Sequence, residues 1–81
     1  MTDEKLWKRP LTIAIGSVKY VVKSARDAAW LLADKWPVLT GDAFVRALRA
    51  CAAVMEGKRG GGHARQALIA AARDANLQIE S

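Results

Sequence analysis

Residues 42–56 read DAFVRALRACAAVME, and the rest of the predicted fold is organised around this stretch. At about 100° per residue, its larger apolar side chains fall on one stripe of an α-helix, flanked by Val45 and Val54. The stripe consists of Phe44, Leu48, Cys51, Ala52 and Met55. The opposite face carries Asp42, Arg46, Arg49 and Glu56. The pattern predicts an amphipathic helix over residues 41–56, capped by Thr40, whose stripe forms the floor of a single core.

Residues 11–23, upstream of this helix, have the pattern of a β-hairpin. Two strand-like runs, LTIAI and VKYVVK, flank Gly16-Ser17, a dipeptide that suits a two-residue type II′ turn with glycine first. This turn would place the alternate apolar side chains of both strands on one face. The pairs that follow are Ile15 with Val18, Ile13 with Tyr20 and Leu11 with Val22. Residues 1–9 are mostly charged, so we expect a flexible arm there and a single compact domain over residues 10–81.

A second helix is predicted over residues 25–36. Ser24 is its natural N-cap, and Pro37 ends it because a residue before proline is driven out of the α-helical region. Its buried stripe comprises Ala25, Ala28, Ala29, Leu32 and Trp36. Trp30 and Leu31 lie off that stripe. Either the N-terminal arm or the C-terminal strand covers them, or they are exposed and form an interface.

A third helix is predicted over residues 63–75, after a basic, glycine-rich loop at residues 57–62. Gly57 in a left-handed conformation would end the central helix, and Asn76 would cap the third. Residues 77–80 alternate between apolar and polar side chains, as a short strand does. The predicted fold class is therefore α+β, with an N-terminal antiparallel hairpin, three helices and a short C-terminal strand.

The composition excludes several classes of protein. The chain has 81 residues, a net charge of +5, one cysteine and one histidine, which excludes an internal disulfide framework and an ordinary zinc site. No apolar stretch approaches the roughly 20 residues that span a bilayer, and the N-terminus lacks the apolar run of a signal peptide. We therefore expect a cytoplasmic protein with no membrane contact, no metal and no cofactor.

A set of residues in this order resembles the small bacterial proteins grouped as domain of unknown function 982 (DUF982). The set comprises the hairpin, residues 24–28 (SARDA), Trp36-Pro37, Gly41, Ala47, Cys51, residues 64–67 (ARQA) and Ala71-Ala72. The hairpin turn is shorter than is usual in that family, and Leu68 stands where a larger aromatic residue is expected. The resemblance covers nearly the whole chain and implies a compact α+β domain. It brings no established activity and no catalytic residue.

Catalytic chemistry finds little support in the sequence. Cys51 could act as a nucleophile with His63 as its base, but Cys51 lies on the apolar stripe, where a free thiol behaves as a small hydrophobe. The loop at residues 57–62 has glycines at the spacing of a phosphate-binding P-loop, but the required Lys-Ser or Lys-Thr is replaced by His63 and Ala64. We therefore expect no enzyme and no catalytic residue.

Two functional interpretations stay open. We expect a non-catalytic protein-interaction module that forms a homodimer with Trp30 at or near the interface, because a sheet of at most three strands leaves edges to cover. The alternative is a nucleic-acid-binding accessory protein that uses arginines and the basic loop for phosphate contacts. The candidate anion or nucleic-acid contacts are Arg46, Arg49, Lys58, Arg59 and Arg65, with Arg73 added in the nucleic-acid case.

Overall fold

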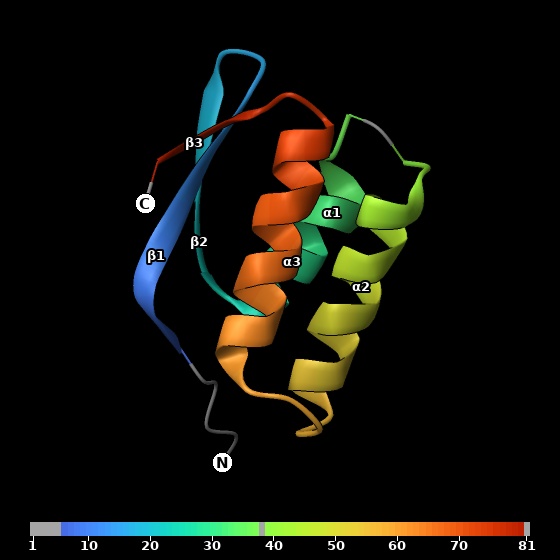
Figure 1. The fold of residues 1–81 in the computed structure, drawn as a ribbon. Coiled ribbons are helices and arrows are strands. Elements are labelled where there is room, and N and C mark those ends of the chain that lie inside the picture. Colours follow the sequence, from blue (N-terminus) through green and yellow to red (C-terminus); the bar gives the residue numbers. More distant parts are fainter. Residues whose placement is uncertain (1–5, 38, 81) are drawn as a thin grey trace.

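The fold consists of a three-stranded antiparallel sheet with three helices packed on one of its faces (Figure 1). The computed structural model describes residues 6–37 and 39–80. In chain order the elements are β1 (Leu6–Ile15), β2 (Val18–Ser24), α1 (Ala25–Asp34), α2 (Asp42–Met55), α3 (Gly61–Asp74) and β3 (Gln78–Glu80). The strand order is β2-β1-β3, so β1 is the central strand. The predicted α+β class and its sequence of elements are confirmed.

The hairpin has the predicted register. Its pairs include Ile15 with Val18, Ile13 with Tyr20 and Leu11 with Val22. In the turn, Gly16 has a φ of +63° while Ser17 has no positive φ, which is the sign pattern of a type II′ turn. The turn therefore fixes which side chains face the helices, and Leu11, Ile13 and Val22 are all buried.

β1 starts earlier than predicted, at Leu6, so residues 6–9 belong to the sheet and not to a flexible arm. Residues 1–5 of the expected arm lie outside the described residues. Leu6 pairs with Ser24, and the register shifts between Leu6 and Leu11, where Pro10 has no N–H to offer a neighbouring strand. Trp7 anchors this part of β1, because its side chain is 8% exposed and packs against the start of α3. Trp7 is thus an apolar anchor within a segment whose other residues are mostly charged.

The first helix starts as predicted and ends earlier. The Ser24 hydroxyl accepts a hydrogen bond from the backbone N–H of Asp27 at 3.2 Å, so Ser24 is the N-cap of α1. Helix α1 ends at Asp34, and Trp36 lies beyond it, where it is still buried in the core. Helix α1 has therefore already ended before Pro37, which restricts the backbone of the connection after the helix.

The starts of α2 and α3 differ from the sequence prediction. Gly41, with a φ of +103°, is the N-cap of α2 and supplies no side-chain hydrogen bond, so the cap predicted at Thr40 is wrong. Helix α3 starts at Gly61 and not at residue 63, because glycine is tolerated in a first helical turn, where backbone N–H groups lack helical partners in any case. The basic loop is correspondingly shorter than residues 57–62.

Helices α2 and α3 end in the same way. Gly57, at a φ of +81°, follows α2, and the N–H of Lys58 donates to the carbonyl of Ala53 at 2.9 Å. Asn76, at a φ of +59°, follows α3, and the N–H of Leu77 donates to the carbonyl of Ala72 at 2.8 Å. Both are Schellman motifs, which confirms the left-handed conformation predicted at Gly57 and the cap predicted at Asn76.

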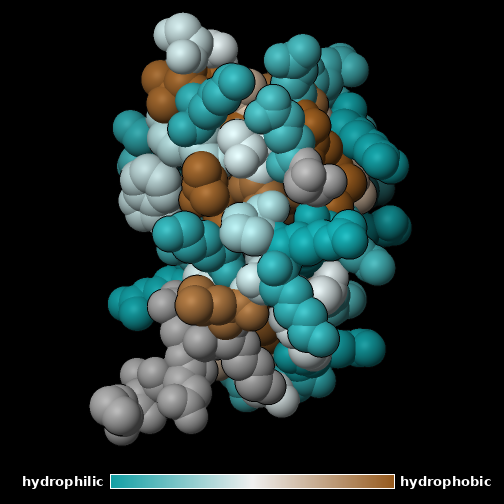
Figure 2. Space-filling view, turned by 90° about the vertical axis from the view of Figure 1, so that its left-hand side faces the viewer, coloured by the Kyte–Doolittle hydropathy of each residue, from teal (hydrophilic) through white to brown (hydrophobic). Residues whose placement is uncertain are grey.

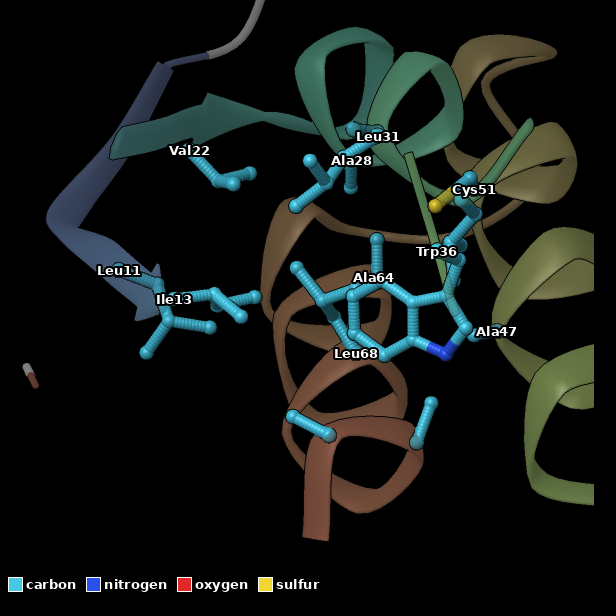
Figure 3. Packing of buried hydrophobic residues seen from close by; sticks show 14 of the residues in the cluster. Leu11, Ile13, Val22, Ala28, Leu31, Trp36, Ala47, Cys51, Ala64 and Leu68 are labelled. Atoms are coloured by element: carbon cyan, nitrogen blue, oxygen red, sulfur yellow. The ribbon is translucent and has the colours of Figure 1, made fainter. Parts of the chain in front are cut away.

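The core lies between the inner face of the sheet and the three helices (Figure 3). Leu11, Ile13 and Val22 project from the strands toward Leu31 of α1 and Leu68 of α3. Leu31 is 1% exposed, which corrects the expectation that it forms an interface. Its position off the predicted stripe was misleading because the buried face of α1 is wide enough to include both Leu31 and Leu32.

Helix α2 buries a different stripe from the predicted one. Its buried residues are Ala47, Ala50, Cys51 and Val54. Phe44 and Leu48 are half-buried, whereas Ala52 is exposed and Met55 is 53% exposed. Compared with the predicted stripe, the buried face is turned by roughly 90° toward the alanines, at about 100° per residue. Helix α2 packs closely against α3, and both helices bury small side chains, with Ala47 and Ala64 fully buried.

The other face of the sheet carries no helix (Figure 1). Seen from this side, separate hydrophobic residues stand among hydrophilic ones (Figure 2). Val21 and Leu6 are the large apolar side chains of this hairpin that are more than half exposed. Across the strands the Lys19 ammonium lies 3.9 Å from the Glu80 carboxylate, and both side chains are largely in solvent. Such an exposed pair contributes little to stability.

Candidate functional site

The first candidate surface lies along the free edge of β2. This strand pairs with β1 on one side and with no other described strand on its second side. Trp30 of α1 is 52% exposed and lies beside Tyr20 of β2, with ring centroids 6.2 Å apart and planes inclined by 59°. Val21 is also 53% exposed. We call Tyr20, Val21, Trp30 and the adjoining strand edge the β2 edge surface. The predicted exposure of Trp30 is therefore observed, without its neighbour Leu31.

The backbone of β2 has hydrogen-bonding groups that point away from β1. In a two-residue hairpin the pair next to the turn is hydrogen-bonded, so Val18, Tyr20 and Val22 bond to β1 and the residues between them face outward. The N–H of Lys23 follows this rule, because it donates to the Asp27 carboxylate at 3.1 Å. Asp27 thus covers one end of the edge. The outward N–H and C=O groups of Lys19 and Val21 are available to hydrogen-bond with a further strand.

The second candidate surface is a groove between α2 and α3. It brings together Arg46, Arg49, Arg59 and His63, but Asp42 and Asp74 line it as well. The three arginines and two aspartates leave the α2–α3 groove with a net charge of about +1 when His63 is neutral. Lys58 is not among the lining residues, and its ammonium lies 3.3 Å from the Glu56 carboxylate. The predicted basic residues are therefore only partly gathered here.

The third candidate surface lies beside the start of α3, where the first residues of β1 run past it (Figure 1). It is a pocket of about 660 Å³, which we call the α3 N-terminal pocket, lined by Leu6, Trp7, Lys8, Arg9, Gly61, Gly62 and Arg65. Arg65 is thus separated from the other predicted arginines, and its Nε donates to the carbonyl of Arg9 at 3.0 Å. Trp7 was not among the functional residues predicted from the sequence, although it is in step, at a period of two, with the buried Leu11 and Ile13.

The family can now be assigned. The family model described as "Protein of unknown function (DUF982)" matches residues 9–79, which is most of the chain. The chain belongs to the DUF982 family. Neither the comparison with curated proteins nor the comparison with solved structures gave a match. The resemblance predicted from the ordered Trp-Pro, Gly, Cys and Ala-Arg residues is confirmed, and the family description assigns no activity to it.

In this DUF982 protein the candidate nucleophile lies in the core. Cys51 is 0% exposed, and burial raises the pKa of its thiol to about 11. The thiolate is the nucleophilic form, so this environment suppresses reactivity at neutral pH. His63, the candidate base, is exposed in the first turn of α3. The structure therefore places Cys51 as a packing residue, with Trp36 and Ala47 close to it in the same cluster (Figure 3).

Within residues 6–37 and 39–80, no helix has the length and apolar character required to cross a bilayer. The same part of the chain holds no group of three or more His, Cys, Asp or Glu side chains arranged to bind a metal ion.

Proposed function

We propose that this DUF982 protein is a non-catalytic interaction module of the cytoplasm that forms a homodimer through the β2 edge surface. The observation that carries the proposal is the half-exposed Trp30, stacked near Tyr20 beside an unpaired strand edge. Exposed strand edges are normally covered or paired, and large aromatic side chains are frequent anchors of interfaces. The raised pKa of the buried Cys51 thiol supports the non-catalytic part of the proposal.

A second copy of β2 fits this edge in one antiparallel register. Lys19 of each copy pairs with Val21 of the other, because these are the residues whose N–H and C=O groups face outward. Tyr20 then lies opposite Tyr20 of the second copy, at the Cα spacing of about 4.5 Å of a non-hydrogen-bonded pair. The two Trp30 rings flank the tyrosines. The Asp27 carboxylate already accepts a hydrogen bond from the N–H of Lys23. Registers in which this N–H must bond to the second copy are therefore disfavoured.

The test is the mass of the protein in solution. Sedimentation equilibrium at micromolar concentration should give about twice the chain mass of 8.8 kDa. Trp30→Ala should shift the equilibrium toward monomer while the circular dichroism spectrum stays native. Leu39→Ala is the control, because Leu39 is 61% exposed and is not among the residues that surround Tyr20, Val21 and Trp30. A wild-type monomer at high concentration would remove the proposal.

A proline substitution tests the strand edge separately from the aromatic residues. Val21→Pro deletes an N–H that faces away from β1, so it should leave the hairpin intact and weaken the dimer. A dimer that resists both Trp30→Ala and Val21→Pro would place the interface elsewhere on the molecule.

Nucleic-acid binding is the alternative function, and the α2–α3 groove is the observation that favours it. Arg46, Arg49 and Arg59 line one surface, but Asp42 and Asp74 line it too, and Arg65 lies elsewhere. We therefore rank it second. Fluorescence anisotropy with labelled DNA or RNA at increasing salt tests it, because phosphate contacts weaken steeply with salt. Tight, salt-dependent binding that Arg46→Gln weakens and Trp30→Ala leaves unchanged would favour this alternative.

A further inference from the structure

The α3 N-terminal pocket combines several hydrogen-bond donors and few acceptors. Helix α3 has Gly60 as its N-cap, which supplies no side-chain oxygen to the first turn. The N–H of His63 bonds to the carbonyl of Gly60 at 3.0 Å. The N–H groups of Gly61 and Gly62 have no carbonyl one turn earlier to bond to, as in the first turn of any α-helix. Both glycines line the pocket, so a ligand there would lie next to the residues that carry these N–H groups.

Two side-chain donors in the same pocket are buried and have no hydrogen-bond partner among the described residues. These atoms are Trp7 Nε1 and Arg65 Nη2. A buried donor without an acceptor costs about 1–3 kcal/mol, and more when it carries charge, so such atoms are uncommon in folded proteins. Both residues line this pocket, so an acceptor bound there could pair with either donor.

The position of Trp7 connects its indole N–H to the helix start. A Cβ placed on Gly61 would lie 3.3 Å from Trp7 Cδ1 and 3.6 Å from Trp7 Nε1, so the indole rests directly against the first residue of α3. Arg65 lies one turn further along the helix, and its Nε is held by the carbonyl of Arg9 at 3.0 Å. This bond holds the Arg65 guanidinium beside the first residues of β1, which line the same pocket.

The charges around the pocket favour an anion. Lys8, Arg9 and Arg65 line it, and none of the described residues that line it is acidic, in contrast to the α2–α3 groove. The start of an α-helix carries partial positive charge and binds oxyanions through its free N–H groups. We propose that the α3 N-terminal pocket binds a phosphate group, held by the N–H groups of Gly61 and Gly62, the Trp7 indole N–H and the Arg65 guanidinium.

Titration with inorganic phosphate, followed by ¹H–¹⁵N NMR of the full chain, tests the proposal directly. The Trp7 indole N–H and the amides of Gly61 and Gly62 should shift together and saturate with one dissociation constant in the millimolar range or tighter. The indole signals of Trp30 and Trp36 should stay in place, because neither ring lines the pocket. Acetate should bind more weakly, since it has fewer oxygens and a single charge.

Two arginine variants of α3 distinguish a built site from general attraction of anions. Arg65→Gln removes the proposed contact, and Arg73→Gln removes the same charge from the exposed last turn of the helix. A charge-assisted hydrogen bond predicts a loss of phosphate affinity of about tenfold or more for Arg65→Gln. Arg73→Gln should change the affinity less than about twofold, as expected for a distant, screened charge.

Gly60→Asp provides a second variant that does not depend on Arg65. Gly60 has an extended conformation with open space around its Cα, so an aspartate there can cap α3 with its own carboxylate. This variant should raise the melting temperature in the absence of phosphate and lose the phosphate response. The proposal is overturned if wild-type shifts do not saturate, if they spread evenly over all basic residues, or if both arginine variants weaken binding equally.

Discussion

Substituting valine for each of two alanines of α2 tests which face of this helix packs against the rest of the protein. Ala47 is 0% exposed, whereas Ala52 is exposed. The apolar pattern of the sequence instead predicts that Ala52 is buried, because it places Ala52 on the core stripe. The matched pair Ala47→Val and Ala52→Val adds the same atoms to the same helix, so a difference between the two variants reports packing alone.

The expected magnitudes follow from burial. Valine is less favourable than alanine within a helix by about 0.5 kcal/mol, and this is the whole cost expected for Ala52→Val. At Ala47 the two added methyl groups enter a filled space near Trp36 (Figure 3). Overpacking of this kind costs about 1–3 kcal/mol, so Ala47→Val should lose about 1.5–3.5 kcal/mol in total. A domain of this length has about 4–12 kcal/mol of stability, so the loss is easily measured.

The assay is urea unfolding followed by circular dichroism, with all proteins at one concentration because dimerisation would contribute to apparent stability. We expect a lower midpoint for Ala47→Val and an unchanged dependence on urea, which indicates an effect on the folded state. Equal losses for the two variants, or a larger loss for Ala52→Val, would refute the packing of α2 through its alanines.

Three further predictions concern single positions. Burial raises the pKa of the Cys51 thiol from 9.0 to about 11, so between these pH values the folded thiol keeps its proton and the unfolded thiol has lost it. The free energy of unfolding should therefore fall as the pH rises through this range. Cys51→Ala should remove this part of the fall, and a thiol reagent should label the wild type slowly until denaturant is added; fast labelling of the folded protein would contradict its burial. Ser24→Ala removes the N-cap of α1 and should cost about 1 kcal/mol in urea unfolding, with no loss disproving the cap. Gly57→Ala places a Cβ at a φ of +81° and should cost about 1–2 kcal/mol by the same measurement, and a neutral result would mean that the end of α2 rearranges freely.

Local rules predicted the parts of the fold that depend on neighbours in sequence. The hairpin register follows from the alternation around Gly16-Ser17, and the cap at Ser24 and the helix end at Gly57 follow from backbone chemistry within a few residues. Hydrophobic periodicity also located α2 correctly. It could not give the rotation of that helix, because which face is buried depends on how closely α3 approaches, and the alanines that allow this approach carry little hydrophobic signal.

The candidate surfaces were harder to predict than the fold. Exposure of Trp30 followed from its place off an apolar stripe, but the same reasoning failed for Leu31, whose burial depends on the sheet beneath α1. The α3 N-terminal pocket joins Trp7 to Arg65, which are far apart in sequence and are brought together only when β1 lies against α3. No local sequence pattern predicts that residues so far apart lie in one pocket. The charged neighbours of Trp7 suggest instead an arm in solvent.

The strand order also determines when each part of the sheet can form. The hairpin of β1 and β2 closes a loop of two residues, whereas β3 must find β1 from the far end of the chain, pairing Gln78 with Ala14. Closing the longer loop costs more entropy, and three residues of pairing give little in return, so β3 should dock last and detach first. A newly synthesised chain therefore presents both edges of its hairpin to its surroundings until β3 has paired with β1. During that interval the central strand is as open to a foreign strand as β2 is in the finished protein.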